Sequence, residues 1–448
     1  MGHLVGKDIY RNLGRKIDSL NVRVPWNETF YAILKELYTE EEAELVASLP
    51  TALSTADELQ RYLQINPTRL RKLLEVLCRK GLVVDIFVNH AYYYIPSPLV
   101  VGIYEFTMMR TDEYIDSAKM AQLFHTYFND EDFFKLNFGA AKGKQMGLMR
   151  TLPYEESFTA QNQEGPAGPD FVEVLDYEKA TAIIEQADIF SIGICSCRHE
   201  QQHTGEKACD MPLDTCMSLS YSAEYLIRNN LAKKASKSQM LENIARSKEL
   251  GLVLNADNVK NNCQFICHCC TCCCHVLQGV NKYGFPDIIV TSSFLAEVRQ
   301  ASCQDCGACV ASCSVNAIKI VTSDTTDRGA KPKKKITIDT SICIGCGVCV
   351  NRCKSKALVM VKRPQRVLHP ETTFEKAIIK CLEKGTLQEQ LFPNPKSITQ
   401  KVLRGLVGGF LRLSPVKQTL MSDTLRSSFL SMLKIGARLQ GKEWLTHI

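Results

Sequence analysis

The stretch CQDCGACVASCSVNAI, residues 303–318, recurs as CIGCGVCVNRCKSKAL at residues 343–358. In both copies the cysteines have the spacing CxxCxxCxxxC, and each cysteine of the first copy lies 40 positions before its counterpart in the second. The eight cysteines are Cys303, Cys306, Cys309, Cys313, Cys343, Cys346, Cys349 and Cys353. A duplicated segment with four thiols in each copy predicts a small, internally repeated unit that is organised around metal.

The spacing of these thiols suits iron–sulfur cubes. Gaps of two residues let one tight turn direct three thiolates to three corners of a cube, while the fourth lies on the following helix and reaches a second cube. Gly307, Gly345 and Gly347 let the backbone approach the sulfides closely and supply unhindered N–H donors. Two structural zinc sites are the alternative, but zinc ribbons rarely use a third thiol at this spacing, so we favour the cubes.

The duplicated segment resembles the bacterial-type ferredoxin fold with two 4Fe–4S clusters. That resemblance implies that each cube takes three cysteines from one copy and the fourth from the other. The implied sets are Cys303, Cys306, Cys309 and Cys353 for one cube, and Cys343, Cys346, Cys349 and Cys313 for the other. The sequence departs from the family at Ser314 and Lys354, where proline is usual, and the insert DRGAKPKKK lengthens the connection between the copies. Neither departure removes a ligand.

The composition is that of a globular protein with an unusual number of thiols. Of 448 residues, 45% are hydrophobic and 23% are charged, but 21 are cysteine. No apolar run reaches the about 18 residues that a membrane-spanning helix needs. The N-terminal segment MGHLVGKDIYRNLGRKID lacks the apolar core of a secretory signal. We therefore expect a cytoplasmic protein whose cysteines stay reduced and bind metal.

A second group of cysteines lies in the segment ICSCRHEQQHTGEKACDMPLDTC, before the duplication. Its four thiols are those of Cys195, Cys197, Cys209 and Cys216. Four thiolates fit one cube or one zinc ion, and a CxC pair is uncommon for structural zinc, so we favour a third 4Fe–4S cluster. His199 and His203 are further candidate ligands, and Arg198 would offset the negative charge of a thiolate-bound cluster.

A third group occupies NCQFICHCCTCCCH, residues 262–275, where seven cysteines follow one another from Cys263 to Cys274. Six of them are crowded most closely, namely Cys267, Cys269, Cys270, Cys272, Cys273 and Cys274. Adjacent cysteines point in different directions, so about half can face one cube. The others could complete the site begun by the second group, bind a fourth cluster, form an unusual cluster, or be buried as small hydrophobes. The number of thiols predicts at least one cluster beyond the two of the duplication.

The chain divides into four predicted regions of an α+β protein. They are a helical, winged-helix-like module at 1–110, a cysteine-rich α/β domain at 111–300, the ferredoxin-like domain at 301–362 and a helical tail at 363–448. The first region reads as helix, turn, helix and hairpin, which is the order of a winged helix. Winged helices often bind DNA, but this region is not strongly basic, so we expect a packing module.

The tail carries the positive charge of the chain. From residue 366 to residue 448 there are 13 Lys and Arg against 6 Asp and Glu, a balance of +7, whereas the whole chain has a net charge of +6. The segment KVLRGLVGGFLRLSPVKQTLMSDTLRSSFLSMLK predicts two basic amphipathic helices. Such helices pack on their own protein, dock on a partner or lie on an anionic membrane surface, and we expect the first most often.

The order of these motifs resembles a group of prokaryotic multi-cluster 4Fe–4S ferredoxin-type proteins. The resemblance rests on CSCRH, QFICHCCTCCC and the duplication, and on YAILKELYTEEEAEL and PLVVGIYEF nearer the N-terminus; the basic tail is not part of it. It implies cluster binding and electron transfer, with no defined substrate.

The leading hypothesis is a relay of single electrons to or from a partner oxidoreductase, because no nucleotide-binding motif is present. An oxidoreductase or activator with an unusual cluster at 263–274, where His268, His275 or Arg198 would donate protons or bind an anion, is the first alternative. An iron–sulfur transcription regulator is the second. Whether the chain is itself an enzyme stays open.

Overall fold

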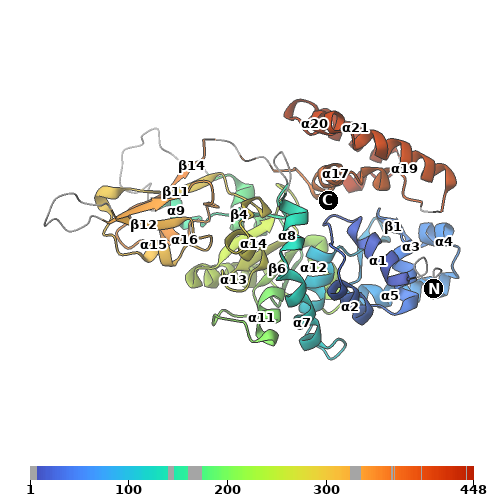
Figure 1. Cartoon of the computed structure of the whole chain (residues 1–448), viewed down its shortest axis with the longest axis horizontal. Helices are drawn as coiled ribbons and strands as arrows, with labels where there is room; N and C mark the ends of the chain where they lie inside the picture. Colours follow the sequence, from blue (N-terminus) through green and yellow to red (C-terminus); the bar gives the residue numbers. More distant parts are fainter. Residues whose placement is uncertain are drawn as a thin grey trace.

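The computed structural model describes residues 8–139, 146–159, 174–322, 334–364, 367, 369–394, 396–439 and 441–447. Helices and sheets are mixed along the chain, as the α+β prediction requires. Figure 1 shows an elongated molecule, with the N-terminal helices at one end, the duplicated segment at the other and a mixed sheet between them. Most of the insert between the two copies lies outside the described residues.

The N-terminal region has the elements that the sequence predicted. Three helices, α1 (Ile9–Asp18), α2 (Glu28–Leu37) and α3 (Glu40–Ser48), precede α4 (Ala56–Leu63), α5 (Pro67–Lys80) and the hairpin β2 (Val83–Val88) and β3 (Ala91–Pro96), to which β1 (Ser54–Thr55) adds a strand. Thr39 and Glu42 form a capping box at the start of α3. Gly81 ends α5 in the left-handed conformation, with φ of 79°.

The basic side chains of α5 are partly neutralised by neighbouring helices. Arg69 forms an ion pair with Glu41 at 2.7 Å, and Lys80 forms one with Glu42 at 2.7 Å. These pairs lower the positive potential that a DNA-contacting helix needs. The winged-helix class itself stays a prediction.

A seven-stranded sheet forms the centre of the molecule, with the strand order β10-β4-β8-β9-β6-β5-β7. The strands are β4 (Met149–Leu152), β5 (Phe190–Gly193), β6 (Cys216–Leu219), β7 (Lys233–Lys234), β8 (Val253–Asp257), β9 (Phe265–Cys269) and β10 (Ile289–Val290). β10 runs parallel to β4, and the other neighbours are antiparallel.

Helices and short turns connect these strands. They are η1 (Leu99–Ile103), α6 (Tyr104–Met108), α7 (Ser117–Phe128), α8 (Glu131–Phe138), α9 (Glu156–Thr159), η2 (Asp176–Glu178), α10 (Ala180–Glu185), α11 (Ser196–Thr204), α12 (Ser220–Arg228), α13 (Lys237–Leu250), α14 (His275–Asn281) and η3 (Pro286–Ile288).

The duplicated segment forms a lobe with two short sheets and two short helices. β11 (Phe294–Val298) pairs with β14 (Leu358–Lys362), and β12 (Ile318–Thr322) pairs with β13 (Lys334–Ile338). The turn η4 (Gln300–Ser302) leads into the first copy, and the helices are α15 (Ala308–Ala311) and α16 (Val348–Arg352), 40 positions apart like the cysteines. β11 lies before the predicted start of the domain at residue 301. Because β11 pairs with β14, the ferredoxin-like lobe begins N-terminal to the predicted boundary.

The tail folds back over the N-terminal and central regions (Figure 1). It comprises α17 (Thr373–Lys384), α18 (Leu387–Leu391), α19 (Ile398–Leu411), α20 (Ser414–Met421), α21 (Asp423–Leu439) and η5 (Glu443–His447). The Trp444 ring packs on Tyr93 of the hairpin at 4.5 Å between centroids, and Lys384 Nζ donates to the Leu20 carbonyl. No helix in the described part of the chain is long and apolar enough to cross a membrane.

Candidate metal centres

The topology of the central sheet gathers its cysteines at one end. β5 and β9 both run antiparallel to β6, which lies between them. Cys216 opens β6, Cys195 follows the end of β5, and Cys267 and Cys269 close β9. Because the end of one strand meets the start of its antiparallel neighbour, these four thiols lie together although up to 74 positions separate them.

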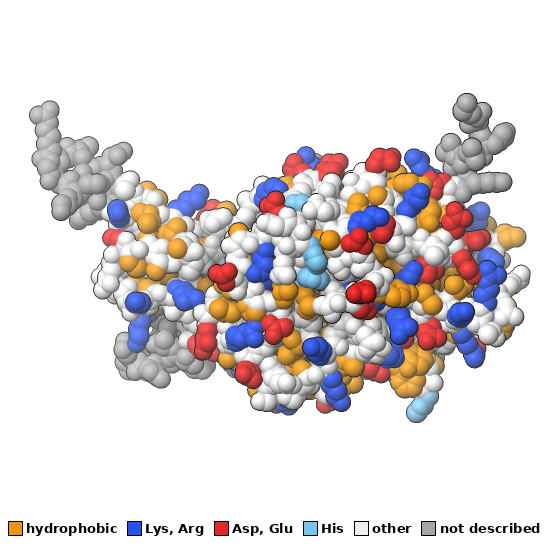
Figure 2. Space-filling model, turned by 90° about the horizontal axis from the view of Figure 1, so that it is seen from below, with side chains coloured by type: hydrophobic (Ala, Val, Ile, Leu, Met, Phe, Trp, Pro, Cys, Tyr) orange, Lys and Arg blue, Asp and Glu red, His pale blue; other side chains and the backbone are white. Residues whose placement is uncertain are grey.

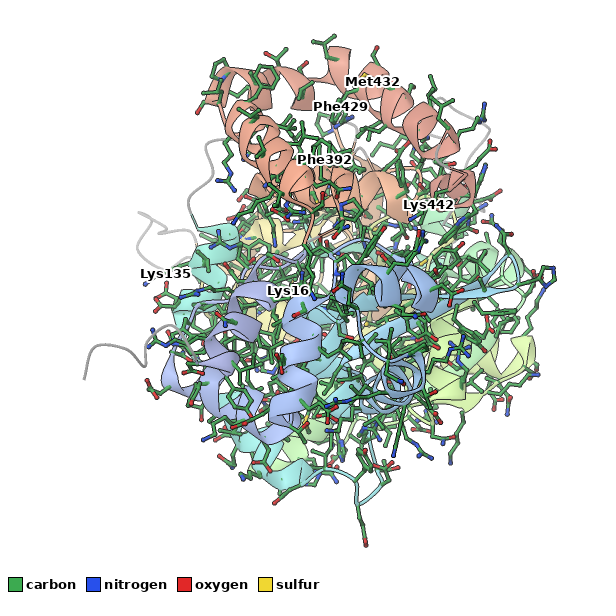
Figure 3. The ribbon with its side chains drawn as sticks, turned by 90° about the vertical axis from the view of Figure 1, so that its right-hand side faces the viewer. Lys16, Lys135, Phe392, Phe429, Met432 and Lys442 are labelled. Carbon is green, nitrogen blue, oxygen red and sulfur yellow. The ribbon has the colours of Figure 1, made fainter. Side chains whose placement is uncertain are left out.

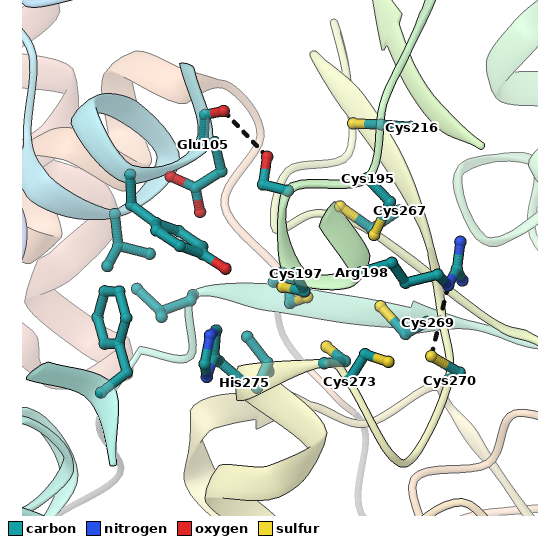
Figure 4. A pocket seen from close by; sticks show the side chains of 18 of the residues that line it. Glu105, Cys195, Cys197, Arg198, Cys216, Cys267, Cys269, Cys270, Cys273 and His275 are labelled. Carbon is teal, nitrogen blue, oxygen red and sulfur yellow. Dashed lines mark hydrogen bonds between the residues drawn. The ribbon is translucent and has the colours of Figure 1, made fainter. Parts of the chain in front are cut away.

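A small cavity at this end of the sheet is lined by six cysteines, together with two that belong to the group described next. The six are Cys195, Cys197, Cys216, Cys267, Cys269 and Cys274, and the cavity that they line, the six-cysteine cavity, has a volume of about 90 Å³. Figure 4 shows Cys195, Cys197, Cys216, Cys267 and Cys269 around this cavity, on the segment that enters α11 and on β6 and β9. Cys197 interacts with Cys195 on one side and with Cys274 on the other, and Cys216 interacts with Cys267.

A second group, the Cys209 group, lies beside the cavity. It consists of Cys209, Cys270, Cys272 and Cys273, whose four sulfur atoms all lie within 4.8 Å of one another. The Cys209 sulfur is 3.9 Å from both Cys270 and Cys273, and the last is 3.5 Å from Cys272. Cys270 and Cys273 also border the six-cysteine cavity.

The structure thus divides the central cysteines differently from the sequence-based grouping. The sequence predicts Cys209 beside Cys195, Cys197 and Cys216, but in the structure it lies with the three thiols of the turn at 270–273. The reason is that Cys209 lies in the loop after α11, which carries it to that turn, whereas the other three lie beside β5 and β6. Cys263 lies outside both groups; its thiol is buried beside Arg150 and contacts the Phe265 carbonyl, and burial raises its pKa to about 11.

Arg198 is a buried cation between the two groups. Its guanidinium donates through Nε to Cys270 Sγ at 3.4 Å, through Nη1 to Thr215 Oγ1 at 2.7 Å and through Nη2 to the His268 carbonyl. Since arginine keeps its charge at all relevant pH values, a cation lies at the position where it would offset the charge of a Cys270 thiolate.

The thiols of the cavity are chemically suited to a metal core. The contact with Cys197, and then burial, raise the pKa of Cys195 well above its usual value. The contact with Cys216, and then burial, do the same to the pKa of Cys267. Thiols that oppose one another's ionisation in this way become stable thiolates when a cationic core lies between them. The donor set therefore fits an iron–sulfur cluster.

Acidic and aromatic residues that the sequence analysis missed complete the cavity. Tyr104 and Glu105 line it from the segment IYEF, and the Ser196 hydroxyl donates to the Glu105 carbonyl at 2.9 Å (Figure 4). Burial raises the pKa of the Glu105 carboxyl to about 7. The sequence links this segment to the cysteines only through the family resemblance. No spacing rule connects it to cysteines about 90 positions away.

A chain of hydrogen bonds leads from the cavity to the surface. His275 Nε2 lies 2.7 Å from Glu200 Oε2, which also accepts from the Tyr104 hydroxyl at 2.7 Å. The other oxygen of Glu200 lies 3.3 Å from Nδ1 of His125, a partly exposed residue. Burial would raise the pKa of Glu200, but His275, His125 and Tyr104 outweigh it and lower that pKa to about 2.

Three histidines named as candidates from sequence have other partners. His199 and His203 face each other, with 3.0 Å between their Nε2 atoms, and His199 Nδ1 lies 2.7 Å from the Met108 carbonyl. His268 Nδ1 lies 2.5 Å from Ser247 Oγ, and burial lowers the pKa of this histidine to about 3. Of the histidines considered, His275 is the one that joins the hydrogen-bond chain at the cavity.

In the ferredoxin-like lobe, the fourth cysteine of each copy lies near the first three of the other. Burial raises the pKa of Cys309, and Cys303 and Cys353 are near enough to add to the rise. Burial likewise raises the pKa of Cys346 to about 12, with Cys343 and Cys313 adding to it. This crossed arrangement is the one that the ferredoxin resemblance implies.

The two sets of the lobe differ in exposure. The outer set, Cys303, Cys306, Cys309 and Cys353, includes the exposed Cys306. The inner set, Cys343, Cys346, Cys349 and Cys313, faces the central domain, where the Tyr154 N–H donates to the Cys346 carbonyl at 3.0 Å. One end of the lobe is therefore open to solvent, and the other is joined to the sheet.

Residues 302–357 match the family model described as a 4Fe-4S dicluster domain. The match contains all eight cysteines of the duplication, so 4Fe–4S clusters are the cofactors of this lobe. Searches of curated proteins and of solved structures found no match. The chain is an iron–sulfur protein with a general role in electron transfer, and it carries a further cysteine-rich region beyond the dicluster domain.

Proposed function

We propose that the protein relays single electrons between a redox partner, met at the exposed end of the ferredoxin-like lobe, and the six-cysteine cavity. Bound 4Fe–4S clusters supply the one-electron chemistry. The residues of the chain hold the clusters, set their burial and leave one end accessible.

The observation that carries this proposal is the contact made by Tyr154. This buried side chain lies between the lobe and the central domain. Its N–H donates to the Cys346 carbonyl at 3.0 Å, and its hydroxyl donates to the Leu252 carbonyl at 2.6 Å. Leu252 in turn packs against Cys270 and Cys273, which border the six-cysteine cavity. A continuous, buried connection thus joins the inner set to the central thiols.

The test uses two electron donors of different size on anaerobically purified protein. Cys306→Ser removes the exposed ligand of the outer set, and Cys381→Ser, a buried cysteine of α17, is the control. We expect a reduced flavodoxin-type protein to reduce the central site of the Cys306→Ser variant at least ~10-fold more slowly than that of the control, because a protein donor must meet the exposed end. Reduced methyl viologen, a small donor, should reduce the central site of both variants at similar rates. Equal rates with the protein donor would refute the relay.

The hydrogen-bond chain favours a second candidate function, the reduction of a small molecule inside the six-cysteine cavity. Such a reaction needs protons as well as electrons, and His125, Glu200 and His275 connect the partly exposed surface to the cavity wall. Small oxidised anions, offered with a strong one-electron reductant, are the test substrates. Turnover that is lost on Glu200→Gln with the iron content unchanged would support this candidate. The absence of turnover and of any anion-induced spectral change would remove it.

A further inference from the structure

The spacing of sulfur atoms in the Cys209 group identifies the kind of metal centre that it fits. Around one tetrahedral ion with metal–sulfur bonds of about 2.3 Å, neighbouring sulfurs lie about 3.8 Å apart. Three of the sulfur–sulfur separations in this group are 3.9, 3.9 and 3.5 Å. In a cube, each thiolate instead extends outward from its own iron, so the four sulfurs are spread more widely.

The same chain contains an internal comparison for this argument. The eight cysteines of the dicluster domain are all described, and they belong to cubes. Among the described residues, the Cys209 group is the one set of three or more Cys, His, Asp or Glu whose ligand atoms lie within 4.8 Å of one another. In neither set of the lobe, and among no three of the six cysteines that define the six-cysteine cavity, do the sulfur atoms all lie within that distance of one another. The Cys209 group therefore differs from the cube-binding sets by its geometry.

The surroundings of the group match a small, closed tetrathiolate site. Cys270 and Cys273 are buried, and Leu252 and Met211 pack around them. Four thiolates around a divalent ion leave a net charge of −2, and the buried Arg198 guanidinium, 3.4 Å from Cys270 Sγ, offsets part of it. The sequence places the three ligands of the turn as CxCC, which is too crowded for three corners of one cube.

We infer that Cys209, Cys270, Cys272 and Cys273 hold one tetrahedral metal ion of the thiophilic class that zinc and ferrous iron represent, and not an iron–sulfur cube. Tetrahedral sites of four sulfurs take these ions. The ion fixes the loop after α11 to the turn at 270–273, directly beside Cys269 and Cys274 of the six-cysteine cavity. It is thus a structural support for the wall of that cavity.

The test is X-ray absorption and metal analysis of the full-length protein, purified anaerobically from iron-supplemented cells. Cys209→Ser removes one ligand, and Cys272→Ser removes another in case the first variant folds poorly. The matched control is Cys78→Ser, which replaces a buried cysteine of α5. We expect one ion with four sulfur neighbours at about 2.3 Å, lost or displaced in both ligand variants and retained in the control. The zinc K-edge and zinc content identify bound zinc, whereas lone iron would be recognised by the loss of about one iron without sulfide in the ligand variants. The cubes should keep their iron in all variants.

The inference is overturned if the ligand variants lose about four iron atoms with the matching sulfide, because that is the content of a cube. It is equally overturned if neither variant changes the zinc or lone-iron content. The iron–sulfur content of the dicluster domain, read from the reduced EPR spectrum, reports separately on the proposed relay.

A different observation concerns the outer surface of the tail. Five apolar side chains form one stripe along α19 and just beyond it, namely Ile398, Val402, Leu406, Phe410 and Leu413, which are 53–81% exposed. α21 adds Leu425, Met432, Ile435 and Leu439, at 43–83%. Figure 3 shows the tail helices as a separate layer over the N-terminal module, with Met432 on the outer side. The inner sides pack on α17 through Leu411 and Leu430.

A cationic hollow adjoins the stripe of α19. It has a volume of about 270 Å³ and is lined by Lys401, Arg404 and Arg412, with Gly405 and Gly409 between them. A Cβ atom at either glycine would meet nothing within 4 Å, so this side of the helix is open. One carboxylate, that of Glu389, also lines the hollow, so the positive side chains outnumber it.

The charge of the helices identifies the occupant of this surface. Residues 398–439 contain seven Lys and Arg and one Asp, a balance of +6 that equals the net charge of the whole chain. On the face seen in Figure 2, by contrast, acidic and basic side chains are interspersed. The geometry points to an anionic membrane surface, with the apolar stripe in the lipid interface and lipid phosphate in the hollow.

Vesicle co-sedimentation of the full chain tests this docking. We expect binding to vesicles with about 30% phosphatidylglycerol and little binding to phosphatidylcholine alone. The double variant Leu406→Ser/Phe410→Ser should lose most of the binding, and Lys401→Gln should weaken it about fivefold, the equivalent of about 1 kcal/mol for one lysine near the surface. Ile320→Ser is the matched control, since Ile320 is an exposed apolar residue of the distant β12.

Equal binding to both vesicles, or unchanged binding of the double variant, would overturn the docking. Displacement by millimolar inorganic phosphate would mean that the hollow binds free anions. Self-association in sedimentation velocity that the double variant abolishes would assign the stripe to a second copy of the chain. Both results contradict the membrane assignment.

Discussion

Two carboxyl groups near the six-cysteine cavity have opposite protonation behaviour because of their neighbours. Glu105 is half-buried, and the removal of its carboxyl from water raises its pKa to about 7 although the Gly102 N–H donates to it at 2.9 Å. Glu200 is fully buried but lies between His275, His125 and Tyr104, which lower its pKa to about 2. The cavity therefore has one carboxyl that changes protonation near neutral pH and one that stays ionised.

Glu105 gives the stability of the protein a defined pH dependence. A folded-state pKa of about 7 against an unfolded value of 4.5 means that the stability contributed by this group is fully present below pH 4.5 and is lost as pH rises through 7. One pKa unit corresponds to about 1.36 kcal/mol, so this group lowers the free energy of unfolding by about 3 kcal/mol between the two pH limits. In Glu105→Gln the amide oxygen still accepts from Gly102, and the pH dependence is absent. Anaerobic denaturant unfolding between pH 5 and pH 8 measures the difference.

We expect the free energy of unfolding of the wild type, minus that of Glu105→Gln, to fall steadily from pH 5 to pH 7. Glu113→Gln, at an exposed position, is the control, and its free energy of unfolding should change with pH as that of the wild type does. A difference that does not change with pH would contradict the environment described for Glu105.

Replacement of Arg198 is expected to lower the free energy of unfolding of the protein. Arg198→Gln leaves thiolate charge and buried carbonyl groups without their cation, and removing one partner of a buried charge pair costs about 3–5 kcal/mol. Arg71→Gln, on the exposed face of α5, should change the stability by no more than about 0.5 kcal/mol. Unfolding of both variants under anaerobic conditions compares the two. Similar stabilities would show that Arg198 does not balance the charge of the central thiols.

Among the elements, the two copies of the duplication differ in what surrounds their turns. Gly307 and Gly347 occupy corresponding positions with φ values of 75° and 78°. A Cβ atom at Gly307 would meet Ile320 at 3.5 Å, whereas one at Gly347 would collide with Ser157 Oγ. The inner turn is thus pressed against the central domain, and the outer turn is not.

This difference predicts unequal effects of the same substitution. Gly307→Ala should cost about 1 kcal/mol, because alanine is strained at positive φ. Gly347→Ala should cost a further 1–3 kcal/mol or so, because the inner turn must move away from Ser157. Thermal unfolding and iron content of the two variants measure this. Equal losses would mean that the lobe is not packed on the central domain as described.

Local elements were predictable where a side-chain signal acts within a few residues. The capping boxes of Thr39 with Glu42 and of Ser236 with Gln239 follow the spacing Ser/Thr-x-x-Glu/Gln, which the sequence shows directly. The apolar run before Cys195 forms β5. The partners of Cys209 were not predictable, because adjacent cysteines in one turn face different directions and the strand order that sorts them depends on residues far apart in the chain.

At the scale of the whole molecule, the duplication is the part of the architecture that the sequence predicts most fully. Its repeat of 40 positions reappears in α15 and α16, and it coincides with the match to the dicluster domain. The hydrogen-bond chain from His125 to the cavity was not predictable. It joins α7, α11 and α14 through side chains that have no common motif, and only the folded sheet brings them together.

The measurement that tests the central claim most directly is iron, acid-labile sulfide and EPR of the reduced protein, for the wild type and for Cys303→Ser/Cys343→Ser. Three cubes predict about 12 iron atoms in the wild type, and the double variant should keep about 4 together with an EPR signal of its own. That result would establish the six-cysteine cavity as a redox centre. About 8 iron atoms in the wild type and none in the double variant would contradict it, and would confine the clusters to the ferredoxin-like lobe.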